Sequence, residues 1–376
     1  MEKIYFDNAA TTALDPEVFE VMKPFFTEKF GNPSSIYSYG RETRIAIESA
    51  RKSIAKILNV HPAEIFFTSG GTESTNTAMN AAVHDLGCKY IISSPIEHHA
   101  TMHCVDYLTK SGQVTSDYVK IKENGHIDMN DLERLLKESK EKCLVTLMHG
   151  NNEIGNLTDI EAVGILCEKY GAIFHSDTVQ TLAHFPLDLQ KIHVHFISGS
   201  GHKFHGPKGV GILYINENIK IHPFINGGSQ ERNMRGGTEN IYGIVGIAKA
   251  LEMANDNREE ERNHINGVRG YMKESLVQNI PGVQFNGDPD GKCLYTVLSV
   301  AFPNTPKSEM LLFNLDINNI CASGGSACTS GAEHGSHVIE ATRQNPNQTT
   351  VRFSFSKYNT KKEVDEVVGK LREILL

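Results

Sequence analysis

The sequence predicts an α/β protein, with a large domain built on a mostly parallel sheet flanked by helices and a smaller α+β domain. Three observations predict this fold: the length of 376 residues, short apolar runs that alternate with helical runs up to about residue 215, and a different pattern after about residue 250. Such a length suggests roughly two to three domains. Continuous apolar strands that alternate with helices are typical of parallel sheets covered on both faces.

The apolar runs define the expected elements of the large domain in chain order. The first is a helix, because isoleucine and alanine residues recur at helical spacing between residues 45 and 58. Helical runs such as 160–170 lie between most of the later apolar runs. Those later runs have the length and composition of buried strands, and they cover residues 64–68, 89–93, 143–148, 172–176, 194–198 and 209–215.

The pattern changes after about residue 250. The stretch 255–264 is highly charged, and a helical run follows it up to Leu276. Strands are expected at 294–302 and 351–355, and a last helix near the C-terminus has one apolar face. We therefore assign residues 16–250 to the large domain, and residues 1–15 together with 251–376 to the small domain.

Charge and composition exclude several classes of protein. The 37 lysines and arginines and the 45 aspartates and glutamates give a net charge of −8, without the basic surface of a nucleic-acid binder. No apolar run approaches the roughly 18 to 20 residues of a membrane span, and the N-terminus has no apolar signal-peptide core. A cytoplasmic protein that binds neither nucleic acid nor membrane is therefore expected.

The seven cysteines are an odd number and contain no Cys-x-x-Cys pair, so neither a disulfide framework nor a zinc ribbon fits. Free thiols in a reducing compartment are expected instead. His98, His99, His103 and Cys104 lie close together in the sequence. Because no HExxH pattern or acidic partner accompanies them, no metal site is predicted.

Ligands of open α/β sheets bind beyond the carboxyl ends of the strands, so the residues that follow each strand are candidates for a site. A run of small residues, from Ser69 to Asn76, follows the strand expected at 64–68. Such a run between a strand and a helix leaves backbone N–H groups free to bind a phosphate. Serine and threonine also favour ordinary helix caps, so a capping turn without a ligand is the alternative.

Two other strand ends carry residues that suit pyridoxal phosphate (PLP). Asp177 follows the strand at 172–176, where it could cap the next helix or hold the ring nitrogen of PLP. Lys203 lies among glycines after the strand at 194–198. Most lysines are solvated charges, but a lysine near a phosphate and small neighbours can form a Schiff base. Lys208, in the same segment, is the more ordinary candidate for a solvated charge.

Ten motifs occur in one order over nearly the whole chain: FDNAATT (6–12), GNPSS (31–35), TSGGTEST (68–75), EHHA (97–100), NNEIG (151–155), HSDTVQ (175–180), SGHKFHGPKGVG (200–211), MRGGTEN (234–240), SGGSACTSG (323–331) and VRFS (351–354). Together they resemble the cysteine desulfurases, which are PLP enzymes of the class V aminotransferase group with fold type I. The motif around Cys328 is similar to that of the group I, iron–sulfur-assembly type.

The resemblance implies a role for each matching residue of the cofactor site. Lys203 matches the lysine that binds PLP covalently, Asp177 the partner of the pyridine nitrogen, and His98 the imidazole stacked on the ring, a catalytic position. Asn152 and Gln180 match residues near the O3′ atom of the cofactor. The phosphate ligands are matched by Gly71, Thr72, Ser200 and His202, and by Thr238, which would come from the other subunit of a homodimer with a shared site.

The resemblance also implies the substrate and the nucleophile. Arg352 matches the arginine that binds the substrate carboxylate, for which a guanidinium has a suitable geometry, and Asn32 matches a residue of the same pocket. Cys328 matches the nucleophile that becomes a persulfide, in a small-domain loop of small residues that suits movement. The implied reaction converts L-cysteine to L-alanine and passes the sulfane sulfur to a protein acceptor, for which an iron–sulfur scaffold is a candidate.

Other functions stay open at this point. A PLP-dependent selenocysteine lyase or aminotransferase would use the same fold, and Cys328 in its glycine- and serine-rich loop disfavours a plain aminotransferase. A non-catalytic PLP-binding or sulfur-carrier adaptor is a third possibility. The intact set of Lys203, Asp177, Arg352 and Cys328 argues against such an inactive protein.

Overall fold

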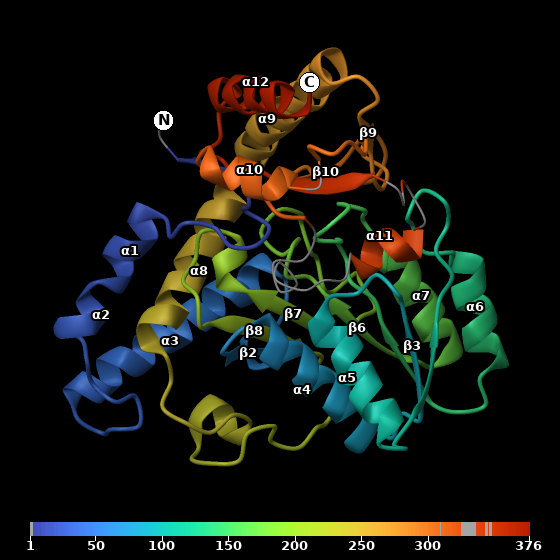
Figure 1. Cartoon of the computed structure of the whole chain (residues 1–376). Coiled ribbons are helices and arrows are strands. Elements are labelled where there is room, and N and C mark those ends of the chain that lie inside the picture. Colours follow the sequence, from blue (N-terminus) through green and yellow to red (C-terminus); the bar gives the residue numbers. More distant parts are fainter. Residues whose placement is uncertain (1–2, 309, 325–335, 343–344, 346–347) are drawn as a thin grey trace.

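The computed structural model describes residues 3–308, 310–324, 336–342, 345 and 348–376. Its largest element is a seven-stranded sheet in the order β2-β8-β7-β6-β5-β3-β4 (Figure 1). β8 is antiparallel to its neighbours β2 and β7, and the other strand pairs are parallel, which confirms the predicted mostly parallel sheet. The strands are β2 (Ile65–Thr68), β3 (Tyr90–Ser93), β4 (Thr115–Tyr118), β5 (Cys143–Thr146), β6 (Ile173–Asp177), β7 (Phe196–Ser200) and β8 (Gly211–Ile215).

Helices cover both faces of this sheet. Successive side chains of a strand point to opposite faces, so each face needs its own hydrophobic core. In β2, for example, Phe67 packs in the core on one face and Phe66 in the core on the other. The first core contains α3 (Ser38–Ile57), α6 (Met129–Glu138), α7 (Ile160–Tyr170) and α8 (Ile241–Asp256). The second contains α4 (Gly71–His84) and α5 (His99–Lys110).

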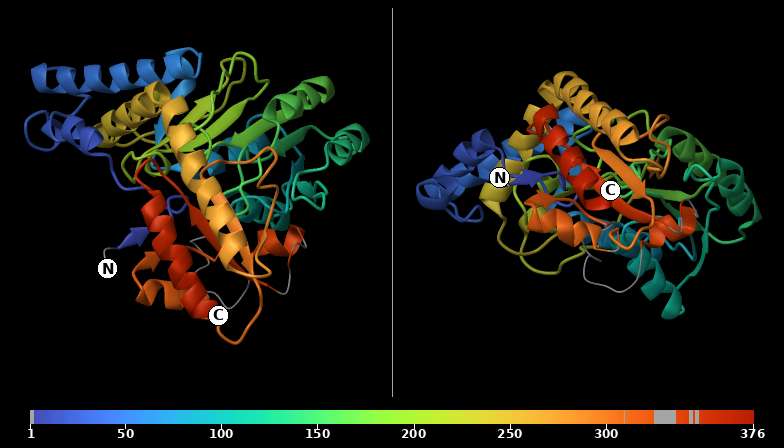
Figure 2. Two further views of the ribbon diagram at one scale, coloured as in Figure 1. Left: turned by 90° about the horizontal axis from the view of Figure 1, so that it is seen from above. Right: turned by 45° about the horizontal axis from the view of Figure 1, so that its top comes forward.

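A further hydrophobic core surrounds a three-stranded antiparallel sheet in the order β12-β10-β9. α9 (Arg258–Asn279) and α12 (Lys361–Leu375) pack in this core, on the side of the molecule where both termini lie (Figures 1 and 2). The N-terminal strand β1 (Ile4–Tyr5) pairs in parallel with β11 (Ile320–Cys321). The other elements are α1 (Pro16–Met22), α2 (Pro24–Thr27), β9 (Gln284–Phe285), β10 (Val297–Phe302), α10 (Leu311–Ile317), α11 (His337–Thr342) and β12 (Thr349–Ser354).

Two consecutive helices, α8 and α9, belong to different hydrophobic cores. α8 ends at Asp256 and packs against the large sheet, whereas α9 begins at Arg258 and packs against the small sheet. Ile4 and Phe6 pack with the small sheet as well. The domain boundary near residue 250 stays a prediction. None of the helices in the described part of the chain is long and apolar enough to cross a membrane.

Two differences from the expected elements have a clear physical reason. β4 was not predicted, because this edge strand has the polar and largely exposed sequence Thr-Ser-Asp-Tyr and carries no apolar periodicity. β6 and β7 run on to Asp177 and Ser200, beyond their last apolar residues. Both polar side chains are therefore held rigidly at strand ends, and both belong to the candidate site.

Candidate active site

A cavity of about 230 Å³ lies where β6 and β7 end and α4 begins, the place where α/β sheets bind ligands. It brings together every predicted site residue except Asn32, Thr238 and Cys328. The lining is Ala9, Ala10, Gly71, Thr72, His98, Ala100, Met148, Asn152, Asp177, Val179, Gln180, Ser200, His202, Lys203 and Arg352.

Lys203 is held by the N-terminal segment that crosses the cavity. Its Nζ atom donates hydrogen bonds to the carbonyl oxygens of Ala9, at 2.7 Å, and Ala10, at 2.9 Å. The lysine ends a short 3-10 turn, Gly201–Lys203, directly after β7. Gly206 allows this turn to fold tightly, since a Cβ there would come within 2.8 Å of the Gly201 carbonyl oxygen. The ammonium group is thus fixed in the cavity by rigid backbone.

Asp177 and Gln180 form the wall beside Lys203. The Asp177 carboxylate accepts a hydrogen bond from the backbone N–H of Val179 at 2.9 Å. Burial raises the pKa of Asp177 to about 6, and the hydrogen bond from Val179 and the charge of Lys203 oppose this rise. A cationic ring nitrogen would favour the ionised form of such a buried carboxyl. The Gln180 side chain donates to the Ala9 carbonyl oxygen at 3.0 Å.

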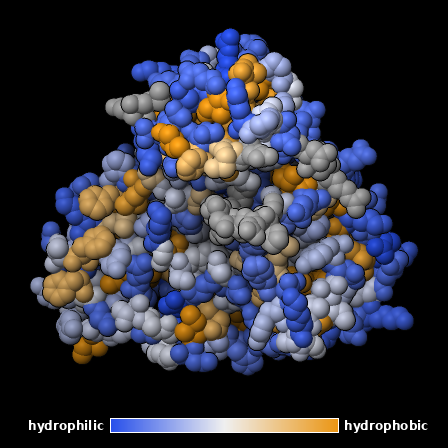
Figure 3. Space-filling model, in the orientation of Figure 1, coloured by the Kyte–Doolittle hydropathy of each residue, from blue (hydrophilic) through white to orange (hydrophobic). Residues whose placement is uncertain are grey.

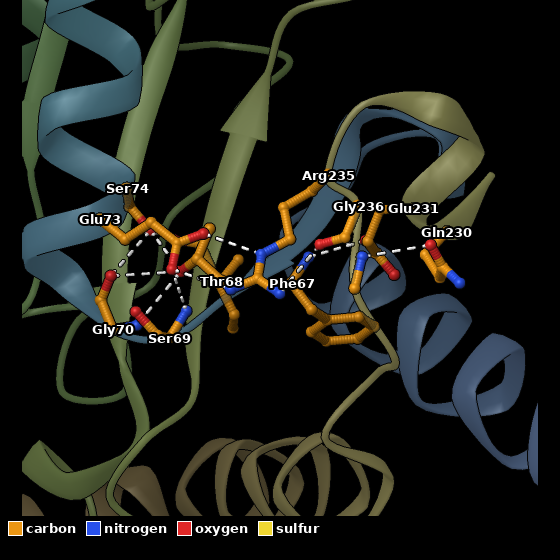
Figure 4. Close-up of polar contacts among 12 residues, drawn as sticks. Phe67, Thr68, Ser69, Gly70, Glu73, Ser74, Gln230, Glu231, Arg235 and Gly236 are labelled. Atoms are coloured by element: carbon orange, nitrogen blue, oxygen red, sulfur yellow. Dashed lines mark hydrogen bonds and ion pairs between the residues drawn. The ribbon is translucent and has the colours of Figure 1, made fainter. Parts of the chain in front are cut away.

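Residues 69–73 join β2 to α4 and include the first residues of that helix (Figure 4). We call this segment, which is predicted to bind the phosphate, the phosphate loop. Gly71 and Thr72 open α4, so their side of the cavity has the N–H groups and positive dipole end of a 14-residue helix. A Cβ on Gly71 would come within 2.6 Å of Val179 Cγ2, so a larger residue there would have to displace the Val179 side chain. Ser200 lies beside Gly71, because a Cβ on that glycine would come within 3.7 Å of Ser200 Cβ, and His202 lines the same cavity. Burial, and then the charge of Lys203, lower the pKa of His202 to about 4, so its ring is neutral at pH 7.

His98 is the N-cap of α5, and its Nδ1 atom accepts a hydrogen bond from the backbone N–H of Ala100 at 3.1 Å. This bond places the proton of the neutral ring on Nε2. Burial lowers the pKa of His98 to about 4, and the charge of Lys203 adds to the effect. A neutral imidazole of fixed tautomer suits a residue that lies against a cofactor ring.

Glu97 precedes His98 and is fully buried. Its carboxyl group accepts hydrogen bonds from the Ser94 hydroxyl and the Met148 N–H. Burial raises the pKa of Glu97 from its ordinary 4.5 to about 8, in spite of those bonds. The folded protein therefore keeps a proton that the unfolded chain has lost, and this group lowers the free energy of unfolding as the pH rises from 4.5 to 8.

Replacement of Glu97 by glutamine is expected to remove this contribution. The free energy of unfolding of the Glu97→Gln protein should fall less steeply between pH 5 and pH 8 than that of the unaltered protein. Denaturant unfolding at a series of pH values measures the slope. Glu42→Gln, at an exposed glutamate on the surface of α3, is the control and should keep the original slope. An unchanged slope in the Glu97→Gln protein would contradict the prediction.

Arg352 is buried on β12 and reaches the cavity from the small sheet. Its Nη1 donates to the Asn152 carbonyl oxygen at 2.9 Å, and its Nη2 donates to Asp7 Oδ1 at 2.7 Å. Its Nε atom is buried without a hydrogen-bond partner among the described residues. Arg352 lines the cavity, and a planar guanidinium suits the carboxylate of a ligand.

Three predicted residues lie elsewhere. Asn32 is exposed, and its side chain accepts a hydrogen bond from the Ser34 N–H instead of lining the cavity. Thr238 is also exposed, and it lines a smaller cavity of about 80 Å³ between the phosphate loop and the segment that follows Arg235. Cys328 lies outside the described residues.

Several residues of the site were not predicted from the sequence. Asp7, the acidic partner of Arg352, and the two carbonyl groups that hold Lys203 all belong to the motif FDNAATT, which had no assigned role. Met148, Val179 and Ala100 line the cavity with ordinary apolar side chains. The clustering of asparagine, alanine and threonine in that motif was the available signal for a backbone that approaches the site closely.

The residues of the cavity fit PLP. A buried carboxyl group, Asp177, lies at a strand end, and a helix N-terminus without a Cβ at Gly71 offers a phosphate cradle. Lys203 and Arg352 line the same cavity. These are the acid, the anion site and the amine that PLP enzymes supply to the cofactor.

Comparison with known proteins agrees with this fit. Residues 4–367 match the aminotransferase class-V family. The chain is 41% identical to the cysteine desulfurase IscS of Dictyoglomus turgidum over 99% of this chain and 94% of that one. It is 38% identical to the cysteine desulfurase NifS of Azotobacter vinelandii, over 100% and 93%.

Solved structures give the same result. A NifS-like protein superposes with a TM-score of 0.92 at 37% identity, over 100% of this chain and 99% of that one. A NifS-like protein from Rickettsia africae superposes with a TM-score of 0.89 at 31% identity, over 99% of both chains. The chain therefore belongs to the class-V aminotransferases, which are PLP enzymes, and within them to the cysteine desulfurases.

Proposed function

We propose that this cavity converts L-cysteine to L-alanine and that the sulfur leaves as a persulfide on Cys328. As a member of its family the chain is a PLP-dependent cysteine desulfurase, and the proposal concerns which residues perform the reaction. The observation that carries it is the convergence of Lys203, Asp177 and Arg352, from distant parts of the chain, on one cavity.

The described residues divide the work as follows. When bound, PLP supplies an electron sink for the α-carbon of the substrate. Asp177 holds the proton of the ring nitrogen, because its buried carboxylate is best stabilised by a cation. Lys203 Nζ moves the α-proton of the substrate as a general base and acid. Arg352 orients the substrate through its carboxylate, and His98 packs against the cofactor as a neutral ring.

Cys328 is the proposed sulfur acceptor, because it matches the nucleophile of the family motif. Its thiolate attacks the sulfur of the substrate, so an S–S bond forms, the C–S bond breaks, and the electron pair of that bond stays with the carbon skeleton that becomes alanine. A protein thiol or an iron–sulfur scaffold then takes the sulfane sulfur. The described cysteines are all free thiols, which supports a reducing, cytoplasmic setting.

We also propose a homodimer. Large side chains are exposed around α1, α2 and the segment before α3, among them Phe26 (50%), Phe30 (65%) and Ile36 (87%). Phe26 stacks on Tyr242, and Phe30 on Tyr39, without covering them. Apolar side chains gather on this side of the surface, over α1 and α2 (Figure 3). Such a patch marks an interaction site, and a second copy that supplied Thr238 would cover it.

The experiment is a product assay on the purified, PLP-loaded protein. With L-cysteine and a thiol reductant, we expect alanine and sulfide in equal amounts, because each turnover breaks one C–S bond. Pyruvate in place of alanine would contradict the proposal. Transfer of the amino group to a 2-oxo acid would favour the aminotransferase, and turnover restricted to selenocysteine would favour the lyase.

A further inference from the structure

An ion pair connects the phosphate loop with the segment that leads to Thr238 (Figure 4). The Arg235 guanidinium donates to both carboxylate oxygens of Glu73, from Nε at 3.0 Å and from Nη2 at 3.2 Å. Glu73 also accepts a hydrogen bond from the Ser69 N–H at 2.9 Å. Both side chains are mostly shielded, with exposures of 24% for Arg235 and 17% for Glu73. A bidentate, shielded pair fixes geometry better than an exposed one.

Glu73 lies in the first turn of α4, next to Gly71 and Thr72. A helix N-terminus stabilises negative charge, and the phosphate of PLP would bring further negative charge to this turn. The Glu73 carboxylate and that phosphate are both negative and would repel each other. Arg235 compensates for the carboxylate, so it favours phosphate binding in its own chain through Glu73.

The loop that carries Arg235 is held by its backbone. The Gly236 N–H donates to the Ile225 carbonyl oxygen at 2.8 Å, and the Gly237 N–H donates to the Gln230 side chain at 3.2 Å. A Cβ on Gly236 would come within 2.6 Å of Gly227 Cα, so these two segments are in direct contact. Thr238 follows directly, and its position therefore depends on where this loop is anchored.

The start of the same loop is anchored to the sheet. Glu231 accepts hydrogen bonds from the buried Arg51 guanidinium, at 2.7 and 2.8 Å, and from the Phe67 N–H at 2.8 Å. Glu231, Arg232 and Asn233 all have left-handed backbone conformations, with φ of 43°, 57° and 66°. Such a run is unfavourable for residues with a Cβ. The loop thus needs its anchors, and the Glu73–Arg235 pair is the anchor that joins it to α4.

We propose that the Glu73–Arg235 ion pair couples the two cofactor sites of the dimer. Within its own chain it prepares the phosphate loop, and it also fixes the segment that presents Thr238 to the phosphate of the other site. Glu73 and Arg235 are positioning residues, and a defect in their pair weakens both sites. The inference rests on the proposed dimer with its shared site.

Mixed dimers separate the two sites. Chains with two different affinity tags are co-expressed and the mixed dimer is isolated. One chain carries Lys203→Ala, so only the site of the other chain gives the visible absorbance of lysine-bound PLP. That reporting site has its own intact phosphate loop and takes Thr238 from the Lys203→Ala chain. After removal of the cofactor, titration with PLP gives the dissociation constant of the reporting site.

Arg235→Met is then added to the Lys203→Ala chain. We expect PLP binding at the reporting site to weaken by about tenfold, as for the loss of one well-placed hydrogen bond to a charged group. Glu73→Gln in the same chain should weaken it by about threefold, and Arg235→Lys should restore part of the affinity. The inference would be overturned if neither Arg235→Met nor Glu73→Gln changed the dissociation constant of the reporting site. The ion pair would then affect only the cofactor site of its own chain.

Two controls complete the test. Lys220 lies between β8 and this loop and is exposed, so Lys220→Met in the Lys203→Ala chain should leave the reporting site unchanged. An effect as large as that of Arg235→Met would overturn the specific role of the pair. Thr238→Ala in that chain tests the shared site itself. If it has no effect at the reporting site, the proposed dimer arrangement is wrong, independently of the ion pair.

Discussion

The Lys203→Ala protein is expected to lose turnover of L-cysteine by about 10⁴-fold, the upper end of the effect of removing a group that transfers protons. Lys203 Nζ is held by two backbone carbonyls in the cavity that also contains Asp177. No second lysine lines the cavity among the described residues, so no other amine can take its place. The visible absorbance of lysine-bound PLP should disappear with the activity.

Absorbance spectra and the alanine assay check this prediction, with circular dichroism to confirm that the protein is folded. Lys191→Ala is the control, since Lys191 precedes β7 in the same part of the chain but is exposed and does not line the cavity. It should keep the visible absorbance. Retained absorbance in the Lys203→Ala protein would show that another amine binds the cofactor.

Most of the site was predictable because its side chains follow buried strands. Asp177 and Ser200 end β6 and β7, and Gly71 begins the helix after β2. Continuous apolar runs can be recognised locally in the sequence. Because ligands of α/β sheets bind at the carboxyl ends of the strands, the residues that follow these runs are expected to lie close together. The roles of the single residues came from the motifs, since periodicity contains no information on chemistry.

The remaining contacts were not predictable because they join segments that are distant in the sequence. The Arg352–Asp7 pair spans 345 positions, and no local pattern reports such a contact. The acceptors of Lys203 Nζ are backbone carbonyls, which every residue carries. β4 was missed for a related reason, because an exposed edge strand has no buried face to impose alternation. Asn32 and Thr238 are exposed in the single chain and do not line the cavity.

The Cys328→Ala protein is expected to bind PLP normally and to release no sulfide above the assay background. The nucleophile of a sulfur transfer is the thiolate, so a cysteine that stays protonated is a poor acceptor. Burial raises the pKa of every described cysteine, to about 12 for Cys88 and about 11 for Cys104, and likewise for Cys143, Cys167, Cys293 and Cys321. None of these thiols lines the cavity, which leaves Cys328 as the candidate.

Sulfide and alanine are measured together with the spectrum of bound PLP, so that loss of sulfur transfer is distinguished from loss of the cofactor. Cys321→Ala is the matched control, because Cys321 is the nearest cysteine in the sequence and pairs with β1 through its backbone. It should retain both products, since its half-buried thiol has a raised pKa and lies outside the cavity lining. Equal sulfide release from the Cys328→Ala and unaltered proteins would show that the substrate sulfur leaves without a persulfide on Cys328. The desulfuration would then rest on the Lys203 site alone, with free sulfide as its direct product.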